Sequence, residues 1–279
     1  MSAQQALLTI LDDKIRNDRL VLPTLPEIAL RVRQRADDAS VSLAQMAEVI
    51  SQDPSLAARL MKVANSAFMG RSIKVSTLNQ AVTRIGLSQI KNIATAMAVE
   101  QLFISQYKQV QQHLDKLWKD NVQVAAIAVA CLKAYQTVNK QCTLSADVMT
   151  LCALVHNIGA LAVITEAERH PEVFGHPIFL TSVIDKAAPY ISVKVLKAWG
   201  FDDELQRAAK TWRVCKASPE LDYTDFIRLA AVARGFYKST EEQHQLLTHY
   251  VTQQVVSVPE FMQQPQIANL YQDIRQLFQ

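Results

Sequence analysis

The stretch ALVHNIGALAV, residues 153–163, places a histidine, His156, and an asparagine, Asn157, inside an otherwise apolar segment. Imidazole nitrogens and side-chain oxygens are common ligands of divalent metals, and a metal-bound water can attack a phosphoester. The same pair could instead be a core feature, because buried polar side chains almost always have a hydrogen-bond partner. The motif therefore suggests a metal site, the remnant of one, or a polar pair in a core.

The remaining histidines and cysteines form no pattern typical of a metal site. No histidine occurs between Phe179 and Gln243, and His244 and His249 are five residues apart. That spacing places the last two on different faces of a helix, since positions three or four apart share a face. The chain has four cysteines without CxxC spacing, which we expect to be reduced, buried thiols: Cys131, Cys142, Cys152 and Cys215.

The composition indicates a globular, helical protein. Of 279 residues, 49% are hydrophobic and 20% charged, and only 6 are glycine, which disfavours helix by about 1 kcal/mol relative to alanine. A net charge of +3 gives no sign of a nucleic-acid or membrane partner. The beginning of the chain lacks the basic region of a signal peptide, and we find no apolar run near the ~18 residues of a membrane span. We expect a cytoplasmic protein.

Helix-start signals are frequent, whereas strand-like alternation is almost absent, so we predict an all-α fold. Ser42 with Gln45 has the form of a capping box, and Asp53 before Pro54 is an N-cap followed by a favoured proline position. Ser145 is expected to begin the helix that carries the motif. The polar stretch 106–116 is the expected seam between two contiguous helical lobes, residues 1–110 and 111–279, the second of which includes a C-terminal helical extension.

Three blocks of sequence carry a family resemblance: LPTLPE at 22–27, QDPSLAARLMKVANSAF at 52–68 and AVTRIGLSQIKN at 81–92. In this order they make residues 20–215 similar to the HDOD domain, a bacterial signalling module related to HD-domain phosphohydrolases. The resemblance implies that the second lobe is an HD-like helical core. In HD enzymes a His-Asp pair joins further histidines and an aspartate to hold one or two divalent metals.

This chain departs from the ligand set that the resemblance implies. The His-Asp pair falls on His156 and Asn157, and an amide lacks the charge of the carboxylate that bridges two cations. The upstream histidine position falls on or beside Asp120. The remaining ligand positions fall near Ala188, Thr211, Trp212 and Ala231. We therefore predict a degenerate metal site with no catalytic residue, no metal and no other cofactor.

A helix that is apolar on all sides is buried, so we expect His156 and Asn157 to bond across to Asp120 or Asn121. Trp212 is expected to fill space that metals would occupy. The predicted vestigial pocket comprises Asp120, Asn121, His156, Asn157, Thr211 and Trp212. On this view Asn157→Asp is unfavourable without a metal, because an unpaired buried carboxylate is costly.

Residues 76–102 have the helix, glycine turn, helix pattern of a DNA-binding hairpin, with Ser76 and Ser88 as expected helix starts around Gly86. The second helix would present Gln89, Lys91, Asn92 and Thr95, which include a single cation. DNA affinity draws on several contacts between cations and phosphates. We therefore favour a hairpin that packs inside the first lobe.

We predict a non-catalytic signal-transduction or regulatory module that acts by binding a protein partner or a small signalling ligand, with no nucleic acid expected. One alternative is a divergent metal-dependent phosphohydrolase acting on a phosphoester or nucleotide through Asp120, His156 and Asn157. A second alternative is a DNA-binding regulator that uses the hairpin at 76–102.

Overall fold

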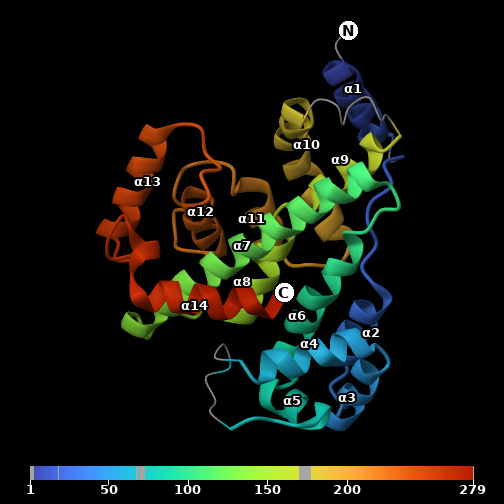
Figure 1. Ribbon diagram of the computed structural model, residues 1–279, viewed down its shortest axis with the longest axis vertical. Helices are drawn as coiled ribbons and strands as arrows, with labels where there is room; N and C mark the ends of the chain where they lie inside the picture. Colours follow the sequence, from blue (N-terminus) through green and yellow to red (C-terminus); the bar gives the residue numbers. More distant parts are fainter. Residues whose placement is uncertain (1–2, 18, 67–68, 70–72, 170–176, 279) are drawn as a thin grey trace.

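The computed structural model describes the chain except residues 1–2, 18, 67–68, 70–72, 170–176 and 279 (Figure 1). Every regular element of the described residues is a helix, which confirms the all-α prediction. The lower part of the molecule in Figure 1 is built from α2 (Glu27–Ala36), α3 (Leu43–Ser51), α4 (Pro54–Ala64), α5 (Leu78–Ile85), α6 (Leu87–Ala98) and η2 (Val99–Leu102).

The long helix α7 (Lys108–Val138) crosses the middle of the molecule and is surrounded by the remaining elements (Figure 1). These are α1 (Ala3–Arg16), α8 (Ala146–Val155), α9 (Gly159–Ala167), α10 (Pro177–Ala198), α11 (Asp203–Thr211), α12 (Tyr223–Ala233), α13 (Thr240–Thr252), η4 (Phe261–Gln263), α14 (Pro265–Arg275) and η5 (Gln276–Phe278). Helices α8, α12 and α14 pack directly against α7, and α10 packs against α9 and α11.

The start signals in the first lobe are partly confirmed. Ser42 forms a capping box with Gln45, and Asp53 caps α4 with Pro54 in its first turn. The cap of α5 is Thr77 rather than Ser76, since its hydroxyl accepts from the backbone N–H of Gln80. Helix α6 begins directly after Gly86, whose φ of 85° suits a residue without a Cβ, so the predicted start at Ser88 was wrong.

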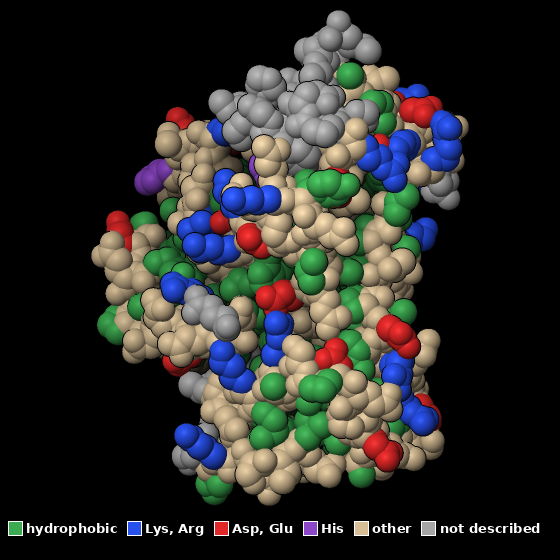
Figure 2. Space-filling model, turned by 45° about the vertical axis from the view of Figure 1, so that its right-hand side comes forward, with side chains coloured by type: hydrophobic (Ala, Val, Ile, Leu, Met, Phe, Trp, Pro, Cys, Tyr) green, Lys and Arg blue, Asp and Glu red, His purple; other side chains and the backbone are tan. Residues whose placement is uncertain are grey.

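Helix α6 is an internal packing element. Its residues from Ile93 to Ala98 are buried, and it packs against α2 and α8. Lys91 pairs with Asp37, while the Asn92 amide donates to Asp147 Oδ2 at 2.7 Å on α8. Among the described residues on the face drawn in Figure 2, lysine and arginine side chains lie among acidic ones rather than in one basic band. Lys91, the single cation of α6, is thus paired with an acidic side chain of the same fold, whereas DNA affinity draws on several cations that contact phosphates.

The polar stretch 106–116, the expected seam between the lobes, contains the start of α7. Val110, Leu114 and Trp118 recur every four residues and are buried, so they form the apolar stripe that keeps this segment helical. The boundary expected at 110–111 consequently falls inside a continuous helix. Helix α1 packs against α9 and α10, at the far end of the molecule from α3 and α5 (Figure 1).

One described stretch, Ala146–Ala167, is long and apolar enough to cross a membrane, with a mean hydropathy of 1.9 over its most apolar window. The expectation that no such run exists was therefore wrong. The fold buries 89% of that window, as it does for a core helix. By itself the stretch is weak evidence for a membrane span.

The closest backbone approach beside the motif is at Gly159, and it generates a stability prediction. A Cβ at this position would lie within 3.0 Å of Ala188 O, Ser192 N and Ser192 Oγ on α10. In an open helical site alanine would stabilise by about 1 kcal/mol relative to glycine. We expect Gly159→Ala instead to lower the free energy of unfolding by about 1–3 kcal/mol, because α10 must move. Urea denaturation checks this, and a stabilised variant would contradict it.

Candidate functional site

The His-Asn motif lies in a turn between two helices, not within one helix as the sequence predicted. Helix α8 ends at Val155, residues 156–158 form a turn, and α9 begins at Gly159. The backbone N–H of Gly159 donates to Ser192 Oγ at 2.8 Å, which attaches the start of α9 to α10. The motif is thus held where α8, α9 and α10 meet.

His156 is a buried, neutral histidine covered by an aromatic ring. It is 2% exposed, its Nδ1 lies 2.6 Å from Ala153 O, and its ring meets the Trp212 indole edge-on with centroids 4.7 Å apart. Since a carbonyl oxygen only accepts, Nδ1 carries the proton of the neutral ring. Burial, together with the nearby Arg213 charge, lowers the pKa of His156 from 6.5 to about 3. The imidazole is therefore uncharged at neutral pH.

Asn157 binds a protein cation. Its Oδ1 accepts from Arg213 Nη2 at 3.3 Å, and Arg213 Nη1 pairs with Asp185 Oδ1 on α10 at 2.6 Å. The guanidinium carbon of Arg213 lies 4.3 Å from the centroid of the Trp212 ring, in a cation–π contact. A permanent positive charge consequently occupies the side of the motif where the resemblance implies a metal.

The expected partners of the motif contact other groups. Asn121 is 1% exposed, and its amide donates to the backbone carbonyl of Leu154 at 3.1 Å, so it holds α8 rather than a motif side chain. Asp120 pairs with Arg234 Nη2 at 3.0 Å. The expectation that Asp120 or Asn121 would bond to the motif side chains was wrong, because a backbone carbonyl and an arginine bind them instead.

Trp212 reaches the motif, whereas the Thr211 side chain does not. The Trp212 indole is 3% exposed and also contacts Phe236, with ring centroids 6.2 Å apart. Thr211 Oγ1 donates to Arg207 O within its own helix. Of the six predicted pocket residues, the structure brings His156, Asn157 and Trp212 together. Arg213 was missed, although it directly follows Trp212 in the sequence.

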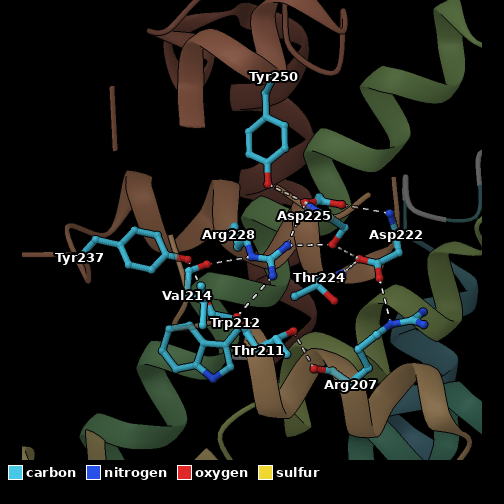
Figure 3. Close-up of polar contacts among 11 residues, drawn as sticks. Arg207, Thr211, Trp212, Val214, Asp222, Thr224, Asp225, Arg228, Tyr237 and Tyr250 are labelled. Atoms are coloured by element: carbon cyan, nitrogen blue, oxygen red, sulfur yellow. Dashed lines mark hydrogen bonds and ion pairs between the residues drawn. The ribbon is translucent and has the colours of Figure 1, made fainter. Parts of the chain in front are cut away.

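A hydrogen-bond network holds the Trp212 backbone (Figure 3). The Tyr237 hydroxyl donates to Trp212 O, and Arg228 donates to Thr211 O and Val214 O on either side of it. Arg228 is fixed in turn by the buried carboxylate of Asp225 at 3.0 Å.

Asp225 is the centre of this network, as Figure 3 shows. Its Oδ1 accepts from the Tyr250 hydroxyl at 2.7 Å and from Ser218 N at 2.9 Å, in addition to Arg228. These bonds join α12 to α13 and to the loop after α11. The end of α11 is thereby fixed, and with it the position of the indole over His156.

The donor set at the motif does not fit a divalent metal. Within the described part of the chain, no group of three or more His, Cys, Asp or Glu side chains could hold a metal ion. Asn157 is neutral, His156 is covered by Trp212, and the guanidinium of Arg213 would repel a second cation. The side chains of the motif are therefore a poor ligand set for a divalent metal.

The buried His156 generates a pH prediction. Its unfolded pKa is near 6.5 and its folded pKa about 3, so the unfolded chain binds more protons between these values. The stabilisation that comes from the neutral ring is complete above about pH 6.5 and falls by about 1.4 kcal/mol per pH unit below it. The excess stability of wild type over His156→Gln should therefore shrink by about 2 kcal/mol between about pH 6.5 and pH 5.

Urea denaturation at several pH values measures that difference, and His244→Gln, an exposed position on α13, is the matched control. The control should follow the wild-type pH curve. A pH-independent difference between wild type and His156→Gln would contradict a buried neutral imidazole.

The Arg213 contact reverses the expected effect of Asn157→Asp. The new carboxylate would face Arg213 Nη2 instead of being unpaired. We expect Asn157→Asp to be tolerated in wild type but strongly destabilising in an Arg213→Met background, with a coupling energy of about 1–3 kcal/mol. A double-mutant cycle by urea denaturation measures this coupling, and additivity to within about 0.5 kcal/mol would contradict it.

The sequence and the fold both match known proteins. The family model of the HDOD domain matches residues 22–212. A crystal structure from Shewanella amazonensis SB2B, described as "Putative metal-dependent phosphohydrolase", is 40% identical, with both chains covered in full and a TM-score of 0.94. An HDOD domain protein with unknown function from Geobacter sulfurreducens shares the fold at 19% identity and a TM-score of 0.61, over 98% of this chain and 96% of that one.

A curated protein of Treponema pallidum (strain Nichols), called "Uncharacterized protein", is 28% identical over 152 residues. The match includes 54% of this chain but only 27% of the length of that relative. The family match covers the LPTLPE entry, both further sequence blocks and the helices that hold the motif. This chain therefore belongs to the HDOD domain family.

Proposed function

We propose that this protein is a non-catalytic regulatory module of signal transduction, which works by binding a small ligand or a protein partner in the cytoplasm. The observation that carries the proposal is the state of the motif: a neutral, indole-covered His156 beside an Asn157 whose oxygen binds Arg213. A hydrolytic centre of the HD type needs metal-activated water. The side chains of the motif are engaged with an arginine and a tryptophan instead.

Membership of the HDOD family and the fold shared with phosphohydrolase-like proteins support a regulatory or phosphohydrolase-like role. The Shewanella protein is described as metal-dependent, and at 40% identity that description raises the enzyme alternative for this chain. The residues of this chain argue against it, since Asp120 is paired with Arg234 and Asn157 with Arg213. A cationic side chain at each of these positions disfavours a divalent cation.

Metal analysis of protein purified without chelator tests the proposal. We expect substoichiometric metal and no change in unfolding free energy on adding Mn²⁺, Mg²⁺ or Ni²⁺, whereas a site filled at about 100 times its Kd would stabilise by about 2.7 kcal/mol. A parallel screen of phosphomonoesters, phosphodiesters and nucleotides should show no turnover. Tightly held stoichiometric metal would contradict the proposal. Hydrolysis of any of these substrates would also contradict it if His156→Ala abolished the activity while the protein remained folded.

A further inference from the structure

Unpaired nitrogen atoms occur on Trp212 and on two arginines that are linked to it by contacts with aromatic rings. Among the described residues that are not exposed, the buried side-chain nitrogen or oxygen atoms without a hydrogen-bond partner are Trp212 Nε1, Arg213 Nε and Arg234 Nε. Arg213 stacks on the Trp212 ring at 4.3 Å. Arg234 lies 5.8 Å from the Phe236 ring, which itself contacts Trp212. We call Trp212, Arg213 and Arg234 the Trp212 cluster.

All three unpaired atoms of the cluster are N–H donors. An indole nitrogen and a guanidinium nitrogen donate and never accept, so these groups cannot satisfy one another. Leaving a buried donor unpaired costs about 1–3 kcal/mol, and native proteins contain few such atoms. Three such donors on residues linked by ring contacts point to an acceptor that the side chains of the cluster do not supply.

The acceptor best suited to the cluster is negatively charged. Two of the three donors belong to guanidinium groups, and hydrogen bonds from guanidinium to carboxylate or phosphate are among the strong ones. Asp185 and Asp120 bind the arginines through their Nη atoms, which leaves both Nε atoms available. The side chains of Arg213 and Arg234 are 23% and 33% exposed, so the cluster reaches the surface although Trp212 is buried.

We propose that the Trp212 cluster is a metal-free binding site for a small oxyanion, a carboxylate or a phosphate, which accepts hydrogen bonds from Trp212 Nε1 and the two Arg Nε atoms. This inference rests on the proposed function. It specifies the class of ligand that such a regulatory module would bind. An oxyanion bound there would contact the end of α11 and the C-terminal end of α12. Because Trp212 packs on His156, anion binding would be coupled to the turn that carries the motif.

The direct test follows the indole N–H resonances of the full-length protein by ¹⁵N NMR during titration with sodium phosphate and, separately, sodium acetate at constant ionic strength. Trp212→Phe assigns the Trp212 signal and removes its donor but keeps an aromatic ring. Trp199→Phe is the matched control, since Trp199 is also a buried indole but donates to Pro23 O at 2.9 Å.

We expect the Trp212 N–H signal to move in a saturable way with at least one of the two anions, while the Trp199 signal stays in place. Calorimetric titration should show binding that is about tenfold to a hundredfold weaker in Trp212→Phe, because a hydrogen bond to a charged acceptor is lost. Arg213→Lys, which keeps the charge but removes Nε, should also weaken binding. Trp199→Phe should bind as wild type does.

Two results would overturn the inference: no saturable shift of the Trp212 signal with either anion, or equal weakening of binding in both tryptophan variants. Failure here is distinguishable from failure of the proposed function. Absence of anion binding in a metal-free protein removes this site but leaves a regulatory role. Stoichiometric metal removes the regulatory proposal whatever the anion titration shows.

Discussion

The guanidinium of Arg213 is the group on which the candidate site depends. It binds Asn157 in the turn after α8, pairs with Asp185 on α10, and stacks on Trp212 at the end of α11. Buried polar groups almost always have a hydrogen-bond partner. The Arg213 side chain provides that partner for Asn157 and also contacts α10, through Asp185, and the end of α11, through Trp212. A positive charge that belongs to the protein also makes a divalent cation unfavourable at the same point.

The surrounding fold keeps that arrangement in place. Trp212 can cover His156 only if the end of α11 is fixed, and the network of Asp225, Arg228 and Tyr237 fixes it through backbone carbonyls. On the opposite side, the close approach of Gly159 to α10 sets the turn that carries the motif. The site is therefore the meeting point of several helices that are held to one another by protein side chains and backbone groups.

Much of this was predictable from the sequence, and the rest depends on contacts between distant residues. The all-α fold follows from capping signals and helical periodicity, and the sequence itself shows an asparagine, Asn157, at the position where the resemblance implies a carboxylate. The pairing of Arg213 with Asp185 could not be read from one sequence, because it depends on how α10 and α11 pack. The turn at the motif was missed because the close approach at Gly159 is a tertiary feature. The helical start of α7 inside the polar stretch 106–116 was not predicted, because the polar majority of this stretch conceals a buried stripe.

The central claim is that a protein guanidinium, and not a metal, is the cation at the motif. A crystal structure of the protein soaked in Mn²⁺, with anomalous scattering recorded for manganese, tests it most directly. We expect no anomalous peak within coordination distance of His156 or Asn157, and we expect Arg213 to bind both Asn157 and Asp185. A manganese ion coordinated by His156, with Arg213 displaced from Asn157, would contradict it.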